Sequence, residues 1–312
     1  MANWKEIKRR IKSITNTAKI TKAMELISTV KMKKAQDAAS SKKKYILWLM
    51  DVFSSLTESF SENKFFKKCE KDENWKTIWK TLWVVITSNK WLCWWYNINV
   101  LKQINTFVKE KNIWENEMDF VALWKRWAQF IARTWNKLVS DFSEDFTDNV
   151  NQIVSKEISR DLQKKFLDWW YSKVVIFYTH YINTIKQVAL TRKILPVTKN
   201  SVEKYFKDIL WDEYIEWSIE KTDKISHTVE PSEEEFLNEI LPMFIDFKFY
   251  DILLESKASE HSSRMLAMKN ATDNAKKFAW ELNLQYNKAR QAAITTEIGE
   301  IVSWVESMKD IS

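Results

Sequence analysis

The chain has 312 residues, 29% of them charged, a mean hydropathy of −0.42 and two cysteines. A chain of this length can bury a full core, as one large domain or two smaller ones. Its longest apolar runs, such as 82–86, are too short to cross a bilayer, so we expect no direct membrane insertion. Cys69 and Cys93 form neither a disulfide framework nor a zinc spacing, which indicates reduced thiols.

The positive charge is concentrated at the start of the chain. Residues 1–44 contain thirteen Lys or Arg and three acidic residues, a net charge of +10. The whole chain carries +7, so the remainder is −3. This distribution indicates an acidic partner for the first segment, which could be a protein surface, nucleic acid or anionic lipid.

Both ends of the chain have the apolar spacing of long helices. In the first, a stripe with helical spacing is followed by a neighbouring one: Ile7, Ile11, Ile14 and Ala18, then Ile20, Met24 and Ile27. In the last, a heptad seam alternates three and four residues: Met265, Met268, Thr272, Ala275, Ala279, Leu282, Tyr286, Ala289, Ala293 and Thr296. We therefore predict helices over about 3–55 and 256–308, paired as an antiparallel coiled coil.

The middle of the chain has a different rhythm. Short β-branched or aromatic runs predict strands at 81–87, 118–123, 173–178 and 184–194, and helical spacing occurs at 97–111 and 150–167. Alternating strands and helices favour an α/β domain with a parallel, Rossmann-like sheet. The predicted organisation is a helix over 1–58, an α/β domain over 77–200, a connector over 201–255 and a helix over 256–312. Within the connector, the acidic run 230–235 is typical of a helix start.

Motifs for catalysis are missing. One glycine cannot supply a phosphate-binding loop, and no Ser, Cys or His lies in a recognisable nucleophile pattern. His180, His227 and His261 are too scattered to predict a metal site. We therefore expect no catalytic residue, metal or cofactor on this chain.

The terminal segments resemble the gamma subunit of rotary F-type ATP synthases. The segments that carry the resemblance include Ile7-Lys8-Arg9-Arg10-Ile11, Thr21-Lys22-Ala23-Met24-Glu25, Ser259-Glu260-His261, Ala271-Thr272-Asp273-Asn274-Ala275 and Tyr286-Asn287-Lys288-Ala289-Arg290-Gln291-Ala292. The central segments Ile86-Thr87-Ser88 and Tyr96-Asn97 also fit. The resemblance covers nearly the whole chain; 59–76 is extra length, and the region after 200 matches weakly.

The resemblance implies a central rotor shaft inside a ring of three alpha and three beta subunits. Each shaft angle would stabilise one beta conformation, which couples ATP synthesis or hydrolysis to rotation and proton transport. The partner subunits would bind the nucleotide. An epsilon-like subunit and a membrane rotor ring would attach at the foot, and the chain would be peripheral, at the cytoplasmic face of the cell membrane.

The resemblance also implies which residues contact the ring. Arg9, Lys22 and Met24 would lie near the moving beta loops. Arg290, Gln291 and Thr295 would form the upper catch with the ring, and Arg264 would lie lower on the shaft. For Met24, simple coiled-coil packing is an equally good interpretation.

Two other functions remain open at this stage. A gamma-like rotor of an F-like ATPase motor could drive a process other than proton transport, because the shaft does not specify what attaches to its foot. A nucleic-acid-binding basic coiled coil is a weaker alternative, since apolar stripes run through the basic stretch where base-reading residues should lie. We therefore expect no nucleic-acid partner.

The tryptophan content is unusual. A chain of this length should contain roughly 22 glycines, yet it has one glycine and 18 tryptophans. Where the family has G-L-C-G-G-Y-N, this chain has Trp91-Leu92-Cys93-Trp94-Trp95-Tyr96-Asn97. Other tryptophans stand where a turn glycine would be natural: Trp124, Trp127, Trp135, Trp169, Trp170 and Trp304. Our hypothesis is that tryptophan has been recorded in place of glycine at such positions.

Overall fold

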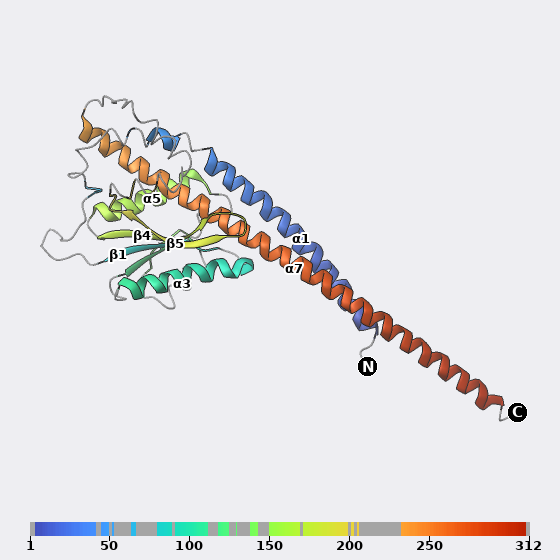
Figure 1. Ribbon diagram of the computed structural model, residues 1–312. Helices are drawn as coiled ribbons and strands as arrows, with labels where there is room; N and C mark the ends of the chain where they lie inside the picture. The colour runs from blue at the N-terminus through green and yellow to red at the C-terminus, as the bar shows by residue number, and fades with distance from the viewer. Residues whose placement is uncertain are drawn as a thin grey trace. The chain divides into compact units, whose positions relative to one another are not determined.

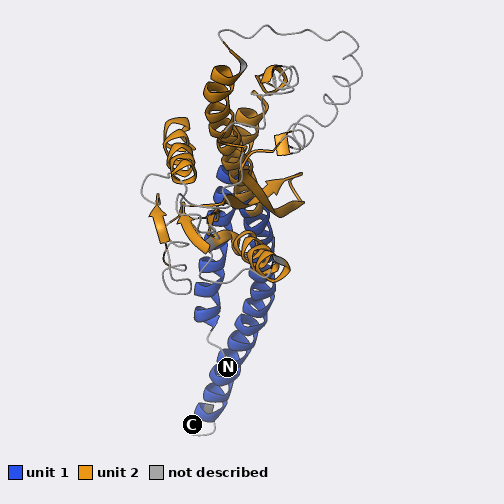
Figure 2. Cartoon of the chain, turned by 90° about the vertical axis from the view of Figure 1, so that its left-hand side faces the viewer, with its two compact units in different colours: residues 1–29, 264–312 blue, residues 30–263 orange. Residues whose placement is uncertain are grey.

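The computed structural model describes residues 4–41, 45–49, 52, 64–66, 80–88, 91–111, 118–124, 129, 138–142, 150–168, 171–198, 201–202, 205 and 232–309. The chain divides into two compact units: unit 1, made of residues 1–29 and 264–312, and unit 2, made of residues 30–263 (Figure 2). Helix α1 (Trp4–Ser40) and helix α7 (Glu233–Lys309) each contribute residues to both units.

Unit 2 contains a five-stranded sheet in the order β3-β2-β1-β4-β5 (Figure 1). Its strands are β1 (Thr81–Val85), β2 (Met118–Ala122), β3 (Leu138–Asp141), β4 (Lys173–Tyr181) and β5 (Gln187–Leu195). The first four strands in this order pair in parallel, and β5 pairs antiparallel to β4. The predicted α/β sheet is therefore confirmed, with an antiparallel edge strand; β3 is the strand that the sequence did not predict.

Helices cover the two faces of this sheet. Successive strand residues point to opposite faces, so Val84 packs in a core with Ile158 of α5 (Gln152–Leu167), whereas Trp83 packs with Val100 of α3 (Trp94–Lys111). Figure 1 shows α5 and α3 on opposite sides of the sheet. Both helices agree with the predictions at 97–111 and 150–167. Asn151 caps α5, because its side chain accepts a hydrogen bond from the Ile153 N–H at 3.0 Å.

The C-terminal helix begins earlier than expected, at Glu233 instead of near 256, so residues 233–255 are helix and not connector. The Ser232 hydroxyl accepts a hydrogen bond from the Glu235 N–H at 3.3 Å, and acidic side chains occupy the first turn. The acidic run thus starts a helix, as predicted. Pro242 lies inside α7, where neighbouring residues such as Leu241 and Phe244 are buried in the unit 2 core.

The N-terminal helix ends earlier than expected, at Ser40 instead of near 55. Ser41 closes it with a backbone hydrogen bond to the Asp37 carbonyl at 3.0 Å. Residues 45–49 are helical again, and 53–55 lie outside the described residues. Of the extra stretch 60–76, the structure describes 64–66, so its role stays open.

The described tryptophans occupy contrasting environments. Trp83 is fully buried, with its ring centroid 4.8 Å from that of Phe177, and its indole N–H has no hydrogen-bond acceptor among the described residues. Trp94 and Trp95, at the start of α3, are 51% and 70% exposed. Trp127, Trp135, Trp169 and Trp170 lie outside the described residues.

Candidate functional site

The two terminal helices of unit 1 pack antiparallel to each other. The Trp4 ring contacts the Tyr286 ring with 6.1 Å between centroids, and the Thr21 hydroxyl lies 2.7 Å from the Thr272 hydroxyl. Because partners further along α1 are earlier along α7, the helices run in opposite directions. The predicted pairing of the termini is therefore confirmed.

The predicted heptad seam is the contact face of α7 in unit 1. Buried or half-buried residues recur every three or four positions: Met265, Met268, Thr272, Ala275, Ala279, Leu282, Tyr286, Ala289 and Ala293. Small side chains at several of these positions allow close approach of the helices. The seam ends there, because Thr296 is exposed.

The seam of α1 begins as predicted and then changes course. Ile7 and Ala18 are buried, but Ile20 and Ile27 of the neighbouring stripe are 61% and 56% exposed. After Ala18 the buried or half-buried face passes through Thr21. Ile20 and Ile27 thus face away from the helix pairing, whereas Met24 of the same stripe is half-buried.

Unit 1 exposes an unusual amount of apolar surface along both helices. The exposed large apolar residues are Ile20, Leu26 and Ile27 of α1, and Phe278, Trp280, Leu284, Ile294, Ile298, Ile301, Val302, Trp304, Val305 and Met308 of α7. We call this set the apolar shaft surface. Apolar surface of this extent on a protein marks an interaction site.

The end of α7 extends past the start of α1. Trp4, the first residue of α1, lies against Tyr286, so residues 287–309 of α7 continue past the start of α1. Figure 2 shows this part of α7 running on alone in unit 1. More than half of the apolar shaft surface on α7 belongs to this extension.

Most of the predicted contact residues are accessible. Arg9, Arg290, Gln291 and Thr295 are exposed. Lys22 is exposed and forms an ion pair with Glu25 at 2.9 Å. Arg290, Gln291 and Thr295 lie together on the α7 extension, where the Thr295 hydroxyl donates to the Gln291 carbonyl at 3.0 Å.

Two of the predicted contact residues are less accessible. Met24 is half-buried, which fits helix packing as well as contact with a partner. Arg264 is only 6% exposed, so its side chain is not available for the direct contact expected of it. The residues next to Arg264 in the sequence do not indicate that it is buried, because its burial depends on packing against distant segments.

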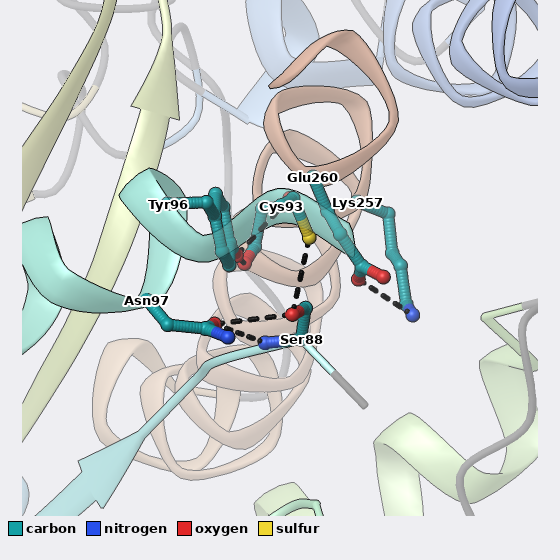
Figure 3. A network of polar contacts seen from close by, with 7 residues as sticks. Ser88, Cys93, Tyr96, Asn97, Lys257 and Glu260 are labelled. Carbon is teal, nitrogen blue, oxygen red and sulfur yellow. Dashed lines mark hydrogen bonds and ion pairs between the residues drawn. The ribbon is translucent and has the colours of Figure 1, made fainter. Parts of the chain in front are cut away.

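A buried polar network lies in unit 2 where β1 ends and α3 begins (Figure 3). The Asn97 side-chain oxygen accepts hydrogen bonds from the Ser88 N–H at 2.9 Å and the Ser88 hydroxyl at 3.1 Å. The Cys93 thiol donates to that hydroxyl at 3.2 Å, and the Tyr96 and Ser256 hydroxyls lie 2.5 Å apart. Burial raises the pKa of Tyr96 well above its usual value of 10.0, so the phenol stays neutral.

The same network holds a buried ion pair on α7. The Lys257 ammonium lies 3.0 Å from the Glu260 carboxylate, with side chains 5% and 3% exposed, and 3.9 Å from the Trp124 ring centroid. Sequence reasoning noted Ser88, Tyr96 and Asn97 only as family matches. Their joint role was not predictable, because the contact from Tyr96 to Ser256 joins residues far apart in the chain.

Serines of α7 form hydrogen bonds with β4 and with the turn that follows it. The Ser259 hydroxyl donates to the Thr179 carbonyl at 3.0 Å, and the Ser262 hydroxyl donates to the Thr184 carbonyl at 2.7 Å. His180 lies 2.8 Å from the Glu255 carboxylate. These contacts explain why a helix rich in serine is nevertheless buried here.

The described part of the chain contains no cluster of His, Cys, Asp or Glu able to hold a metal ion. None of its described helices is long and apolar enough to span a membrane.

A family model described as ATP synthase matches residues 3–308, which places the chain among the ATP synthase subunits. The chain belongs to the ATP synthase gamma chain family. Relatives named ATP synthase gamma chain include one from Geotalea daltonii, 32% identical over 99% of this chain and 100% of its own length. Another, from Herpetosiphon aurantiacus, is 34% identical over 97% of this chain and 98% of its own.

Solved structures share the fold. A chain of the central stalk and c-ring of the Tetrahymena thermophila mitochondrial ATP synthase is 23% identical, with a TM-score of 0.54, and the match covers 81% of this chain and 99% of that one. A chain of the Euglena gracilis mitochondrial ATP synthase, in a structure of OSCP, F1 and c-ring, is 14% identical, with a TM-score of 0.60, over 98% and 94%.

Proposed function

We propose that this chain is the central rotor shaft of an F-type ATP synthase and couples catalysis in the alpha and beta ring to rotation and proton transport. The observation that carries the proposal is the apolar shaft surface on an α7 extension that α1 does not cover. A single helix with so much exposed apolar surface is stable when a partner surrounds it. An apolar sleeve inside the ring supplies such a partner and lets the shaft turn without breaking fixed polar bonds.

Charge supports a second kind of contact. The exposed Arg9 and Lys22 belong to the basic first segment, so acidic beta loops would interact with this side of the shaft. Met24, which is half-buried, would contact the same loops. Because each shaft angle would present these residues to a different beta subunit, it would favour a different beta conformation.

The upper catch would consist of Arg290, Gln291 and Thr295 on the α7 extension. Neither the Arg290 nor the Gln291 side chain makes a hydrogen bond or ion pair within the described part of the chain. Their donors are therefore available to loops of the ring. Arg264 is assigned differently: as a buried residue, it would position α7 and not touch the ring.

In this proposal the chain has no catalytic residue and binds no nucleotide or other cofactor, because the partner subunits bind ATP. It would be a peripheral subunit at the cytoplasmic face of the membrane, with an epsilon-like subunit and a membrane rotor ring at its foot. Pure chain, freed of ring subunits, should show no ATP hydrolysis; turnover that persists through that purification would contradict this part.

Purification of the native complex tests the output of the motor. We expect alpha, beta, an epsilon-like subunit and a membrane rotor ring to co-purify, and ATP hydrolysis by the complex to pump protons into vesicles. Alpha and beta could instead co-purify with subunits other than an epsilon-like subunit and a membrane rotor ring, and the complex could hydrolyse ATP without pumping protons. That result would identify an F-like motor that drives another process.

A further inference from the structure

Unit 2 contains a cavity of about 570 Å³ that plays no part in the shaft. Its lining residues come from the end of α1, from residue 45, from α5 and from α7. The direct contacts between α5 and α7 nearby include a hydrogen bond from the Gln163 amide to the Pro242 carbonyl at 3.3 Å. A volume of this size falls within the range of roughly 300–1,000 Å³ that small-molecule sites occupy.

One wall of the cavity is aromatic. The Tyr45 and Phe247 rings meet with centroids 5.1 Å apart at 53°, and Tyr250 lies one turn further along α7. Burial raises the pKa of Tyr45 and of Tyr250 above 10.0, so both phenols are neutral at pH 7. This wall suits the flat, apolar body of a ligand.

Two polar side chains that line the cavity come from α5. Gln152 and Lys156 both line the cavity and are four residues apart, so they lie on the same face of the helix. Neither side chain makes a hydrogen bond or ion pair within the described residues. An ammonium and an amide N–H₂ are thus both available as donors.

The carboxylate that lines the cavity is already engaged. Asp246 accepts a hydrogen bond from the Gln163 amide at 2.7 Å, and its other oxygen lies 3.8 Å from the Arg160 Nε. Burial raises the pKa of Asp246, while the charges of Arg160 and Lys156 oppose that shift. Lys156 is the one basic side chain among the described residues that line the cavity.

We propose that this cavity binds a small amphipathic organic anion. Its flat body would pack against Tyr45 and Phe247, and its carboxylate, sulfonate or phosphate would accept hydrogen bonds from Lys156 and Gln152. A ligand in this position touches α5 and α7 at once and would stabilise their packing. The inference concerns a site away from the shaft and does not depend on the proposed function.

The test titrates 8-anilinonaphthalene-1-sulfonate, an aromatic sulfonate, into the full chain and follows its fluorescence. Loss of a charge-assisted hydrogen bond in Lys156→Gln should weaken binding about tenfold. Tyr45→Ala should weaken it through the aromatic wall. The matched control is Lys164→Gln, an exposed lysine of the same helix that does not line the cavity, and it should bind like the parent.

Thermal unfolding without the probe shows whether each variant folds. With the probe added, the unfolding temperature should rise more for the parent and for Lys164→Gln than for Lys156→Gln. Equal binding by Lys156→Gln and Lys164→Gln would overturn the proposal. A second arm replaces the probe with phosphatidylglycerol vesicles in a sedimentation assay. If vesicle binding depends on Lys156 but probe binding does not, the ligand is a lipid headgroup, and the proposal of a free ligand is overturned.

Discussion

The hydroxyls of Thr21 and Thr272 lie 2.7 Å apart across the pairing of α1 and α7, inside a seam otherwise built from apolar and small side chains. Thr272 is 2% exposed, and its hydroxyl also donates to the Met268 carbonyl at 2.8 Å. The Thr21 hydroxyl likewise donates to the Thr17 and Ala18 carbonyls, both at 3.1 Å, so either threonine can be the donor across the pairing. A polar pair at one level of a heptad seam favours one register of the two helices, because a slip would separate the two hydroxyls.

The first prediction concerns this pair. Thr272→Val should reduce the free energy of unfolding by about 1 kcal/mol, because it removes the hydroxyl contact between the two helices. The double variant with Thr21→Val should cost less than the sum of the two single changes, since each single change removes the same contact. Thermal and denaturant unfolding of the full chain measures both effects. Thr296→Val, at an exposed position on the same helix, is the control; strict additivity in the pair would contradict the proposed coupling.

The second prediction concerns the buried ion pair of unit 2. Lys257→Met should destabilise the chain by roughly 3–5 kcal/mol, because it removes the ammonium that pairs with the buried Glu260 carboxylate. Adding Glu260→Gln should recover part of this loss. Denaturant unfolding gives the values, and Lys277→Met, an exposed position of α7, should have little effect. A cost for Lys257→Met no larger than that of this control would show that the pair does not stabilise the fold.

The third prediction is a pH dependence. Burial raises the pKa of Asp246, against smaller opposing effects from a Ser159 hydrogen bond and the nearby Arg160. A carboxyl whose pKa is higher in the folded state contributes its full stability below its usual value of 3.8 and loses it as pH rises through the folded pKa. Asp246→Asn should therefore lose less stability than the parent as the pH rises above 3.8. Parallel stability profiles from pH 3 to 7 would contradict the raised pKa.

The features that sequence reasoning predicted are those set by local periodicity. The α7 seam follows from heptad spacing, and β1 and β2 follow from short apolar runs. The early start of α7 was missed, because Pro242 and the surrounding charges suggest a connector. The helix holds there because core residues such as Phe244 stabilise it from one side. β3 was missed because its four residues are only half-buried or exposed.

The candidate site divides in the same way. The exposure of Arg290 and Gln291 follows from their positions off the seam, so a heptad count predicts it. The burial of Arg264 and the network around Asn97 depend on contacts between distant segments, which one sequence does not reveal. The resemblance pointed to these residues but did not distinguish packing from contact with a partner.

The fourth prediction addresses the tryptophans. Trp94 and Trp95, exposed at a helix start, are the kinds of site where a large indole adds little stability, because little of its apolar surface is buried. If the cellular protein has glycine at such positions, its intact mass will be lower than 37.4 kDa by a fixed amount for each replaced residue. Peptide mass spectrometry then locates each one. An intact mass of 37.4 kDa would reject the hypothesis.

The last prediction concerns the upper catch. If Arg290 and Gln291 hold loops of the ring as proposed, replacing both with alanine removes charge-assisted hydrogen bonds of roughly 1.5–3 kcal/mol each. The helix pairing should persist, because both residues lie off the seam and alanine favours helix. The variant should therefore fold and assemble at least in part, but turn over ATP more slowly or produce less torque in the complex.

The matched control replaces Lys276 and Lys277 with alanine. These two exposed lysines precede Arg290 along α7. It removes two positive charges from the same helix, one more than the change at Arg290 and Gln291, so a general effect of charge or solubility would be at least as large in the control. We expect the control to retain more of the turnover and torque, since its side chains are placed on the part of α7 that pairs with α1. If the control is the more damaging, or if the change at Arg290 and Gln291 alters neither assembly nor turnover, the contact lies at another height on the shaft.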